Sequence, residues 1–456
     1  MSHAEKVFIH CTVAQLSETA TMIPTDPLAA PLALPCGAVL ANRLCKTAMT
    51  EGLADAQLRA TARHVRLYRG WSEGGAGLSI TGNVMIDRHV LERPGNVAID
   101  VTHPPSVDAE ARARLRAWAQ AGTVAGNHLW MQISHAGRQS PRYVTRRPLG
   151  PSAVPLDLLG NYATPRALRE DEILDFIGRY AQVAVIAREC GFTGVQVHGA
   201  HGYLISSFLS PVTNQRDDAW GGTLDRRARL LLETVRAVRR AVGDDFPVSV
   251  KLNSDDFRKG GFSHDDCLAV VARLNDERID LLEISGGNYE QPRLLGVAGR
   301  QADAVELRPS TQVREAYFLE YAATIRRVAT MPLMVTGGFR SRAGMEAALR
   351  GGNTDMIGIA RPLCTEPDCA RRLLRFEIDT LPAHEAELHL ARSGWLSPAS
   401  PVLLFKMLNV LGAQGWYYQQ IDRMAAGKPP DLQRGVLRSF GRHLWDEISR
   451  AALMRR

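Results

Sequence analysis

Two histidines and a tyrosine lie close together in the sequence, where a short apolar run gives way to glycine. Residues 195–204 read VQVHGAHGYL, which places His198, His201 and Tyr203 within six positions. A neutral imidazole donates a hydrogen bond from one ring nitrogen, so two imidazoles can converge on one substrate oxygen. A phenol beside them can donate a proton. A histidine pair at this spacing also occurs in metal sites, and on spacing alone both interpretations stay open.

The strands that carry these residues decide what the side chains face, because ligands of α/β proteins bind beyond the carboxyl ends of strands. Short apolar runs predict strands at residues 44–49, 77–81, 129–134, 194–198, 247–252, 280–285, 333–336 and 356–359. Helical spacing predicts helices at residues 61–73, 108–122, 172–190, 225–242, 264–275, 314–327 and 341–350. This alternation predicts a (β/α)8 TIM barrel, with His198 at its mouth. A doubly wound open sheet is the alternative, but no Gly-x-Gly-x-x-Gly opens a first βαβ unit.

The segments outside the barrel predict three parts of the chain. Residues 1–30 are expected to be a flexible leader, and either Met1 or Met22 is the natural start. Residues 31–370 are expected to form the barrel, with a β-hairpin at 31–40 as a lid on its closed end. Residues 371–456 are expected to form a helical extension, which packs on the barrel or at a subunit contact of a homo-oligomer.

The composition is that of an ordinary water-soluble protein. Of 456 residues, 45% are hydrophobic and 23% are charged, and the formal net charge of +7 is spread along the chain. This favours anionic ligands mildly and does not indicate a nucleic-acid partner. The seven cysteines are scattered, as in proteins with reduced thiols. No apolar run reaches the ~20 residues of a membrane span, and no signal peptide is recognisable. We therefore expect a cytoplasmic protein with no membrane partner.

Two glycine-containing turns follow the last two predicted strands. Residues 336–341 read TGGFRS and residues 357–362 read IGIARP. Glycine lets the backbone approach an anion closely, and free N–H groups at a helix start favour phosphate. The loops after strands seven and eight of a barrel are the usual phosphate site, and Arg361 adds a cation there. We expect a phosphorylated cofactor to lie across the barrel mouth.

Three further predicted strand ends carry polar side chains that face the same space. Lys251 ends the fifth strand, where a positive charge can stabilise an anion on a heterocycle. Gln132 lies within the third strand, and its amide can donate and accept toward a pyrimidine-like edge. Thr47 and Thr50 flank Met49 at the end of the first strand. Together these residues are suited to recognise the edges of a flavin ring.

These stretches resemble the old yellow enzyme family of FMN-dependent NAD(P)H oxidoreductases, from about residue 31 to residue 368. The matching segments are NR at 42–43, TAMT at 47–50, MQISHAGR at 131–138, HGAHGYL at 198–204, SP at 210–211, NQRDD at 214–218, GG at 221–222, KLNS at 251–254 and the two glycine turns. The central histidine motif is highly specific. The resemblance implies a TIM barrel, FMN as cofactor, and NADH or NADPH as reductant.

The resemblance also implies a role for each matching residue. The residues implied to hold FMN are Gly337, Gly338, Ala360 and Arg361 at the phosphate, Gln132 and Lys251 at the pyrimidine edge, and Thr47, Ala48, Met49, Thr50 and Asn83 along the ring. His198 and His201 are implied to hold the carbonyl oxygen of an α,β-unsaturated substrate. The flavin N5 is implied to deliver hydride to the β-carbon, while Tyr203 protonates the α-carbon.

Some positions depart from the family pattern. Lys251 stands where many relatives carry Arg, which keeps the charge and loses the bidentate fork. Ala48 stands where Pro is common, and Thr50 where one bacterial branch has Cys, so that a hydroxyl hydrogen bond is expected to tune the flavin.

Two other functions compete with reduction of an enone-like small molecule. The same histidine pocket is compatible with a flavin enzyme whose acceptor is oxygen, a quinone or a nitro compound. A zinc-dependent barrel hydrolase built on His198 and His201 is the other alternative. It leaves Gln132, Lys251 and the double glycine turn unexplained, and no Asp, Glu or Cys nearby in the sequence completes a zinc triad. We therefore predict no metal site.

Overall fold

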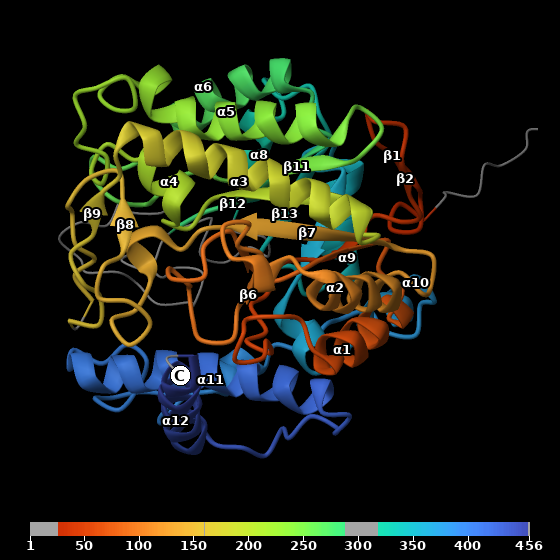
Figure 1. Ribbon diagram of the computed structural model, residues 1–456. Helices are drawn as coiled ribbons and strands as arrows, with labels where there is room; N and C mark the ends of the chain where they lie inside the picture. Colours follow the sequence, from red (N-terminus) through yellow and green to blue (C-terminus); the bar gives the residue numbers. More distant parts are fainter. Residues whose placement is uncertain (1–25, 159, 288–317, 455–456) are drawn as a thin grey trace, which may run out of the picture.

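The computed structural model describes residues 26–158, 160–287 and 318–454, and within them eight parallel strands close into a barrel (Figure 1). In order around the barrel these are β3 (Leu44–Lys46), β4 (Leu78–Ile80), β7 (His128–Ser134), β10 (Gly194–Gly199), β11 (Val248–Asn253), β12 (Leu281–Ser285), β13 (Leu333–Thr336) and β14 (Met356–Ile359). Parallel pairing of β14 with β3 completes the ring. The predicted (β/α)8 barrel is thereby confirmed.

The strand boundaries agree with the sequence prediction except at the first strand. That strand was expected over residues 44–49, but β3 ends at Lys46, and residues 47–50 form a loop at the barrel mouth. Two short strands that the sequence did not indicate, β5 (Val84–Met85) and β6 (Val97–Ala98), extend the sheet beside β7. They follow the mouth end of β4, so this extension lines the same side of the molecule as the predicted site.

Helices surround the barrel (Figure 1). They are α1 (Ala62–Glu73), α2 (Ala109–Gly122), α3 (Glu170–Glu189), α4 (Leu204–Leu209), α5 (Leu224–Val242), α6 (His264–Leu274), α8 (Leu319–Ile325), α9 (Arg342–Arg350) and α10 (Cys369–Leu374). All but α4 and α10 correspond to helices predicted between the strands. Residues 314–317 of the helix predicted at 314–327 lie outside the described residues. The remainder of that prediction contains α8, Leu319–Ile325. None of the helices described is long and apolar enough to cross a membrane.

A β-hairpin closes the amino-terminal end of the barrel. Strands β1 (Leu32–Ala33) and β2 (Val39–Leu40) pair in antiparallel fashion. Leu32, Leu34 and Leu40 form one buried cluster with residues of the barrel interior, namely Cys45, Leu78, Ile80, Trp130, Leu281, Met334 and Met356. This apolar plug fills the lower barrel, so polar side chains are left to the carboxyl ends of the strands. In Figure 1 the hairpin lies at the end opposite to β8 (Leu149–Gly150) and β9 (Arg166–Ala167).

The carboxyl-terminal extension forms two long helices that pack against each other and against the barrel. They are α11 (Leu403–Ala425) and α12 (Val436–Met454), drawn in blue in Figure 1. Glu447 of α12 forms a buried ion pair with Arg93, whose guanidinium lies 3.8 Å from the ring centroid of Tyr418. The predicted leader, residues 1–30, falls mostly outside the described residues.

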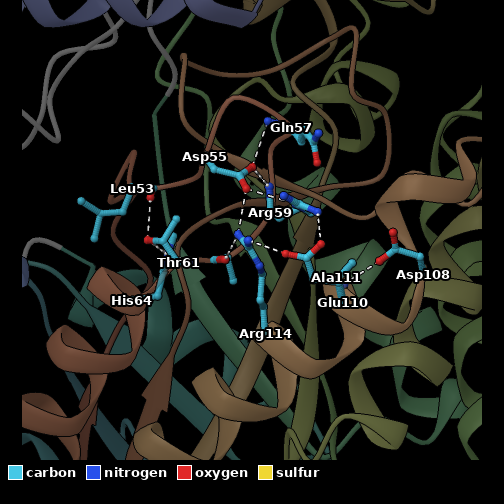
Figure 2. Close-up of polar contacts among 11 residues, drawn as sticks. Leu53, Asp55, Gln57, Arg59, Thr61, His64, Asp108, Glu110, Ala111 and Arg114 are labelled. Atoms are coloured by element: carbon cyan, nitrogen blue, oxygen red, sulfur yellow. Dashed lines mark hydrogen bonds and ion pairs between the residues drawn. The ribbon is translucent and has the colours of Figure 1, made fainter.

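A cluster of charged side chains holds the segment that leads from the mouth loop to α1 (Figure 2). Asp55 accepts hydrogen bonds from Arg59 and Arg114, at 3.1 and 2.8 Å. Glu110 on α2 binds the same two guanidinium groups, at 2.9 and 2.6 Å. Each of these pairs is partly exposed and individually weak. As a network they fasten residues 53–61 to α2.

His64 lies at the inner edge of this segment and is only 1% exposed. Its Nδ1 accepts the backbone N–H of Thr61 at 3.1 Å, and its ring contacts Trp118 with centroids 4.7 Å apart. Burial, with a smaller effect of the Arg63 charge, lowers the pKa of His64 to about 3. The folded protein therefore resists protonation of a histidine that the unfolded chain protonates below about pH 6.5.

This difference predicts that His64 makes the protein sensitive to acid. Stability linked to His64 is fully present above the unfolded pKa and is lost as the pH falls toward about 3, at up to about 1.4 kcal/mol per pH unit. A His64→Gln variant keeps an acceptor for Thr61 and should show a flatter fall in denaturation midpoint between pH 7 and pH 4. His89→Gln, at an exposed position, is the matched control. Equal pH dependence in wild type and His64→Gln would contradict the prediction.

Candidate active site

The three residues of the central motif lie together at the carboxyl end of β10. His198 lies on β10 in register with Lys251 of β11. The ring centroids of His198 and Tyr203 are 4.8 Å apart, and those of His198 and His201 are 5.2 Å apart. His198 and Tyr203 are 3% and 4% exposed, and His201 is partly exposed. Two imidazoles and one phenol therefore share one small volume at the barrel mouth.

The hydrogen bond of His198 indicates its tautomer, and the surroundings of both histidines indicate their charge. The Nδ1 of His198 accepts the backbone N–H of Ala200 at 3.2 Å, so the proton of a neutral ring is on Nε2. The Nε2 of His201 lies 2.7 Å from the hydroxyl of Ser285, on β12. Burial and the positive charge of Lys251 hold the pKa of both rings well below the usual range. Both imidazoles are neutral near pH 7, and each has one N–H to donate.

The backbone of the motif is held in an unusual conformation. His201 has φ of 62°, in the left-handed region that side chains other than glycine seldom adopt, and Gly202 follows with φ of 80°. The N–H of His201 donates to Oδ1 of Asn253 at 3.1 Å, and its carbonyl accepts from Nε2 of Gln139 at 2.8 Å. Asn253 of β11 and Gln139 of the 3-10 helix Gly137–Gln139 thus hold a strained turn in place. Such an arrangement is common where a side chain must point in one direction.

A chain of buried polar side chains crosses the barrel interior beneath the mouth. Nζ of Lys251 lies 2.9 Å from Oε1 of Glu283, and Gln196 donates to Oε2 of Glu283 at 2.9 Å. Gln132 in turn donates from Nε2 to Oε1 of Gln196 at 2.7 Å. All four side chains are 4% exposed or less. The structure therefore joins the two residues expected at the pyrimidine edge, Gln132 and Lys251, through two residues that the sequence analysis had not selected.

The loop after β3 lies against the last strand, and its polar groups meet a buried carboxylate. The N–H of Thr47 donates to the carbonyl of Ile359 at 2.9 Å. The hydroxyl of Thr50 donates to Oε2 of Glu92 at 2.6 Å, and Nδ2 of Asn83 donates to the same oxygen at 3.1 Å. The Thr50 proton expected to reach a flavin is thus directed to Glu92. Oδ1 of Asn83 is buried without a hydrogen-bond partner among the described residues.

Two remaining members of this loop pack rather than hydrogen-bond through their side chains. Ala48 contacts the apolar plug, and Met49 packs on the main core with its sulfur 3.5 Å from that of Cys364. They give the loop an apolar surface.

The turn after β13 has the backbone conformation that the sequence suggested, whereas Gly358, expected in a turn after the last strand, lies within β14. Gly337 and Gly338 have φ of 120° and 87°, and α9 begins after Ser341, whose hydroxyl accepts the N–H of Gly344 at 3.1 Å. Ala360 precedes the short 3-10 helix Arg361–Cys364. Glycine at both positive-φ positions leaves the amide groups accessible to an anion.

Arg361 is held by a carboxylate from the carboxyl-terminal extension. Its Nη1 lies 3.3 Å from Oε1 of Glu385, which also binds Arg340. Tyr417 of α11 donates to Oε2 of Glu385 at 2.7 Å. Arg361 could be identified from the sequence, but Glu385 could not. Glu385 belongs to the carboxyl-terminal extension, and it meets Arg361 only because that extension packs on the barrel.

The donor set fits FMN. An amide pair at one edge, a cation beside it, an unpartnered buried Asn83 oxygen and a glycine turn next to Arg361 provide complementary groups for a pyrimidine ring and a phosphate. The described part of the chain holds no group of three His, Cys, Asp or Glu side chains that could bind a metal ion.

Comparison with protein families supports the same conclusion. The NADH:flavin oxidoreductase / NADH oxidase family matches residues 27–376 of the chain. The chain belongs to this family. It is an NAD(P)H-dependent oxidoreductase of the old yellow enzyme type, with FMN as its cofactor.

The chain matches some known relatives over nearly their whole length and others over only part of it. An NADH-dependent flavin oxidoreductase of Talaromyces variabilis is 33% identical over 417 residues, 87% of this chain and 98% of the relative. One from Neonectria sp. (strain DH2) is 36% identical over 354 residues, but these are 74% of this chain and only 45% of that protein. The old yellow enzyme homologue of Zymomonas mobilis superposes with a TM-score of 0.64 at 26% identity, over 78% of this chain and 94% of the homologue.

Two of the newly found residues, Gln196 and Glu283, do carry a signal in the sequence. Gln196 is two positions before His198, and Glu283 is two before Ser285, so alternation along each strand directs both into the barrel. Charged or amide side chains within otherwise apolar strands are unusual unless they are paired. Their partners could not be named without knowing the strand register.

Gly358 on β14 provides a test of this packing. A Cβ at Gly358 would lie 2.0 Å from Oγ1 of Thr336 and 2.6 Å from Cγ2 of Thr47. The Gly358→Ala variant should therefore lose about 1–3 kcal/mol of stability, as overpacked sites do, and show a lower melting temperature. Gly441→Ala, in α12 with open space around it, should instead be neutral or slightly stabilising. If Gly358→Ala melts at the same temperature as wild type, the prediction is wrong, and Thr336 and Thr47 can move aside without loss of stability.

Proposed function

We propose that the protein reduces the C=C bond of α,β-unsaturated carbonyl compounds. The observation that carries this proposal is the group of two neutral imidazoles and a phenol at the end of β10. Neutral imidazoles that lie this close together can both donate hydrogen bonds to an oxygen that becomes negative during the reaction. A positively charged or metal-bound pair would suit other chemistry.

His198 and His201 would bind the substrate carbonyl oxygen. As neutral rings, they donate hydrogen bonds without giving up a proton, and they stabilise negative charge that develops on that oxygen. Removing one such donor commonly costs about 10²-fold or more in rate. The strained turn at His201 and its bond to Ser285 would keep the two donors convergent before substrate arrives.

Tyr203 would supply the proton for the α-carbon. Its ring packs against His198 at the start of α4, so a substrate held by the imidazoles would present its α-carbon nearby. FMN, when bound, supplies hydride transfer between nicotinamide and substrate. Lys251 would stabilise negative charge at the pyrimidine edge, and Gln132 would bind that edge through its amide. The loop 47–50 and Asn83 would line the ring, and Gly337, Gly338, Ala360 and Arg361 would hold the phosphate.

An anaerobic absorption titration tests this reaction directly. The purified protein, loaded with FMN, is titrated with NADH or NADPH and then with a simple cyclic enone. Bleaching of the flavin spectrum by nicotinamide and its return with enone are the expected results. Bleaching that returns with oxygen, a quinone or a nitro compound and not with enone would replace the enone by one of these acceptors. A protein that takes up no FMN would overturn the assignment of the whole site.

Replacing both imidazoles should selectively weaken the binding of ligands that present an oxygen atom to the site. Phenols mimic the substrate oxygen, so the double variant His198→Ala/His201→Ala should retain FMN and bind a phenol at least tenfold more weakly. Absorption changes of the bound flavin on phenol addition measure this affinity. Tyr203→Phe, which keeps both imidazoles, is the control and should bind the phenol nearly as wild type does. Unchanged phenol affinity in the double variant would exclude the carbonyl-binding role.

A further inference from the structure

Glu283 is a buried carboxylate that the proposed reaction does not use. It lies on β12 in register with Lys251 of β11, and its side chain is fully buried. Oε1 accepts from Lys251 at 2.9 Å and from the hydroxyl of Thr336 at 2.7 Å, while Oε2 accepts from Gln196 at 2.9 Å. A side chain this well satisfied is strongly oriented, because leaving any of its buried partners unpaired would be costly.

The carboxylate determines which way two amides point. An ionised carboxylate can only accept hydrogen bonds, so Gln196 must turn its NH2 group toward Glu283 and its carbonyl oxygen away. That oxygen then requires a donor, which is the NH2 group of Gln132 at 2.7 Å. One N–H of Gln132 is used in this bond, so its carbonyl oxygen and its second N–H are left to bind a ligand. The relay therefore presents an acceptor with a donor beside it, which matches a ring N–H and the neighbouring carbonyl at the imide edge of a pyrimidine.

The same carboxylate limits the positive charge available from Lys251. Opposite unit charges 2.9 Å apart cancel much of each other's field at longer distances. A ring next to this pair would therefore experience far less positive potential than an isolated lysine would create.

We propose that Glu283 is a positioning residue for the flavin. Through Gln196 it fixes Gln132 as an acceptor, and through Lys251 it restrains the stabilisation of the reduced, negatively charged ring. This inference rests on the proposed flavin site and adds to it a residue that touches neither cofactor nor substrate. It explains why a charged side chain is retained in the otherwise apolar strand 281–285.

The test compares Glu283→Gln with Thr336→Val in the full-length protein reconstituted with FMN. Glu283→Gln removes the negative charge and should raise the affinity for reduced FMN over oxidised FMN at least tenfold. For a two-electron couple this raises the midpoint potential by about 30 mV. Thr336→Val removes one hydrogen bond to the same oxygen and keeps the charge, so its ratio should stay within threefold of wild type. Equilibrium reduction against a reference dye measures both.

A Glu283→Gln ratio within threefold of wild type would overturn the proposal. If this variant fails to fold or to bind FMN, Gln196→Met decides, because it breaks the relay and leaves the Lys251–Glu283 pair intact. It should bind oxidised FMN at least tenfold more weakly at an unchanged potential, and wild-type affinity in Gln196→Met would also overturn the proposal. Failure of the wild type itself to bind FMN would count against the flavin site and not against the role of Glu283.

Discussion

The buried ion pair between Lys251 and Glu283 is the interaction on which the site is organised. A charged group in a barrel interior is tolerated only when it is paired and its remaining hydrogen bonds are satisfied. Here the pairing spans adjacent strands, and Thr336 and Gln196 complete it. The absence of a side chain at Gly358 leaves the room in which the Thr336 hydroxyl reaches the carboxylate.

Burial, with a smaller contribution from the charge of Lys251, keeps both histidines of the site neutral by lowering their pKa. His198 is the register partner of Lys251 on the neighbouring strand, and a nearby cation disfavours a second positive charge in a buried place. Neutral rings suit the site, because donors to an oxygen must not act as acids. Cofactor edge and substrate pocket are electrostatically linked through one side chain.

Much of the fold and the centre of the site could be predicted from the sequence, because both depend on local patterns. Alternating strands and helices, the histidine motif of residues 198–204 and the glycine turns are each readable within a few positions. What escaped prediction depends on contacts between distant segments. Gln132 and Gln196 are 64 positions apart, and Arg93 and Glu447 are 354 apart. The end of the first strand was also missed, since the apolar run continues after the ladder stops.

The carboxyl-terminal extension is the part for which local patterns carried least information about function. The sequence predicted a helical extension over residues 371–456 but not what its helices contact. In the structure, Glu385 contacts the arginine expected at the phosphate and itself accepts a hydrogen bond from Tyr417. Glu447 contacts Arg93, one position after the Glu92 carboxylate that binds Thr50 and Asn83. Residues from beyond the barrel therefore contact both ends of the proposed cofactor site. Since contacts at two points restrict movement more than either alone, the extension would act as part of the scaffold of that proposed site.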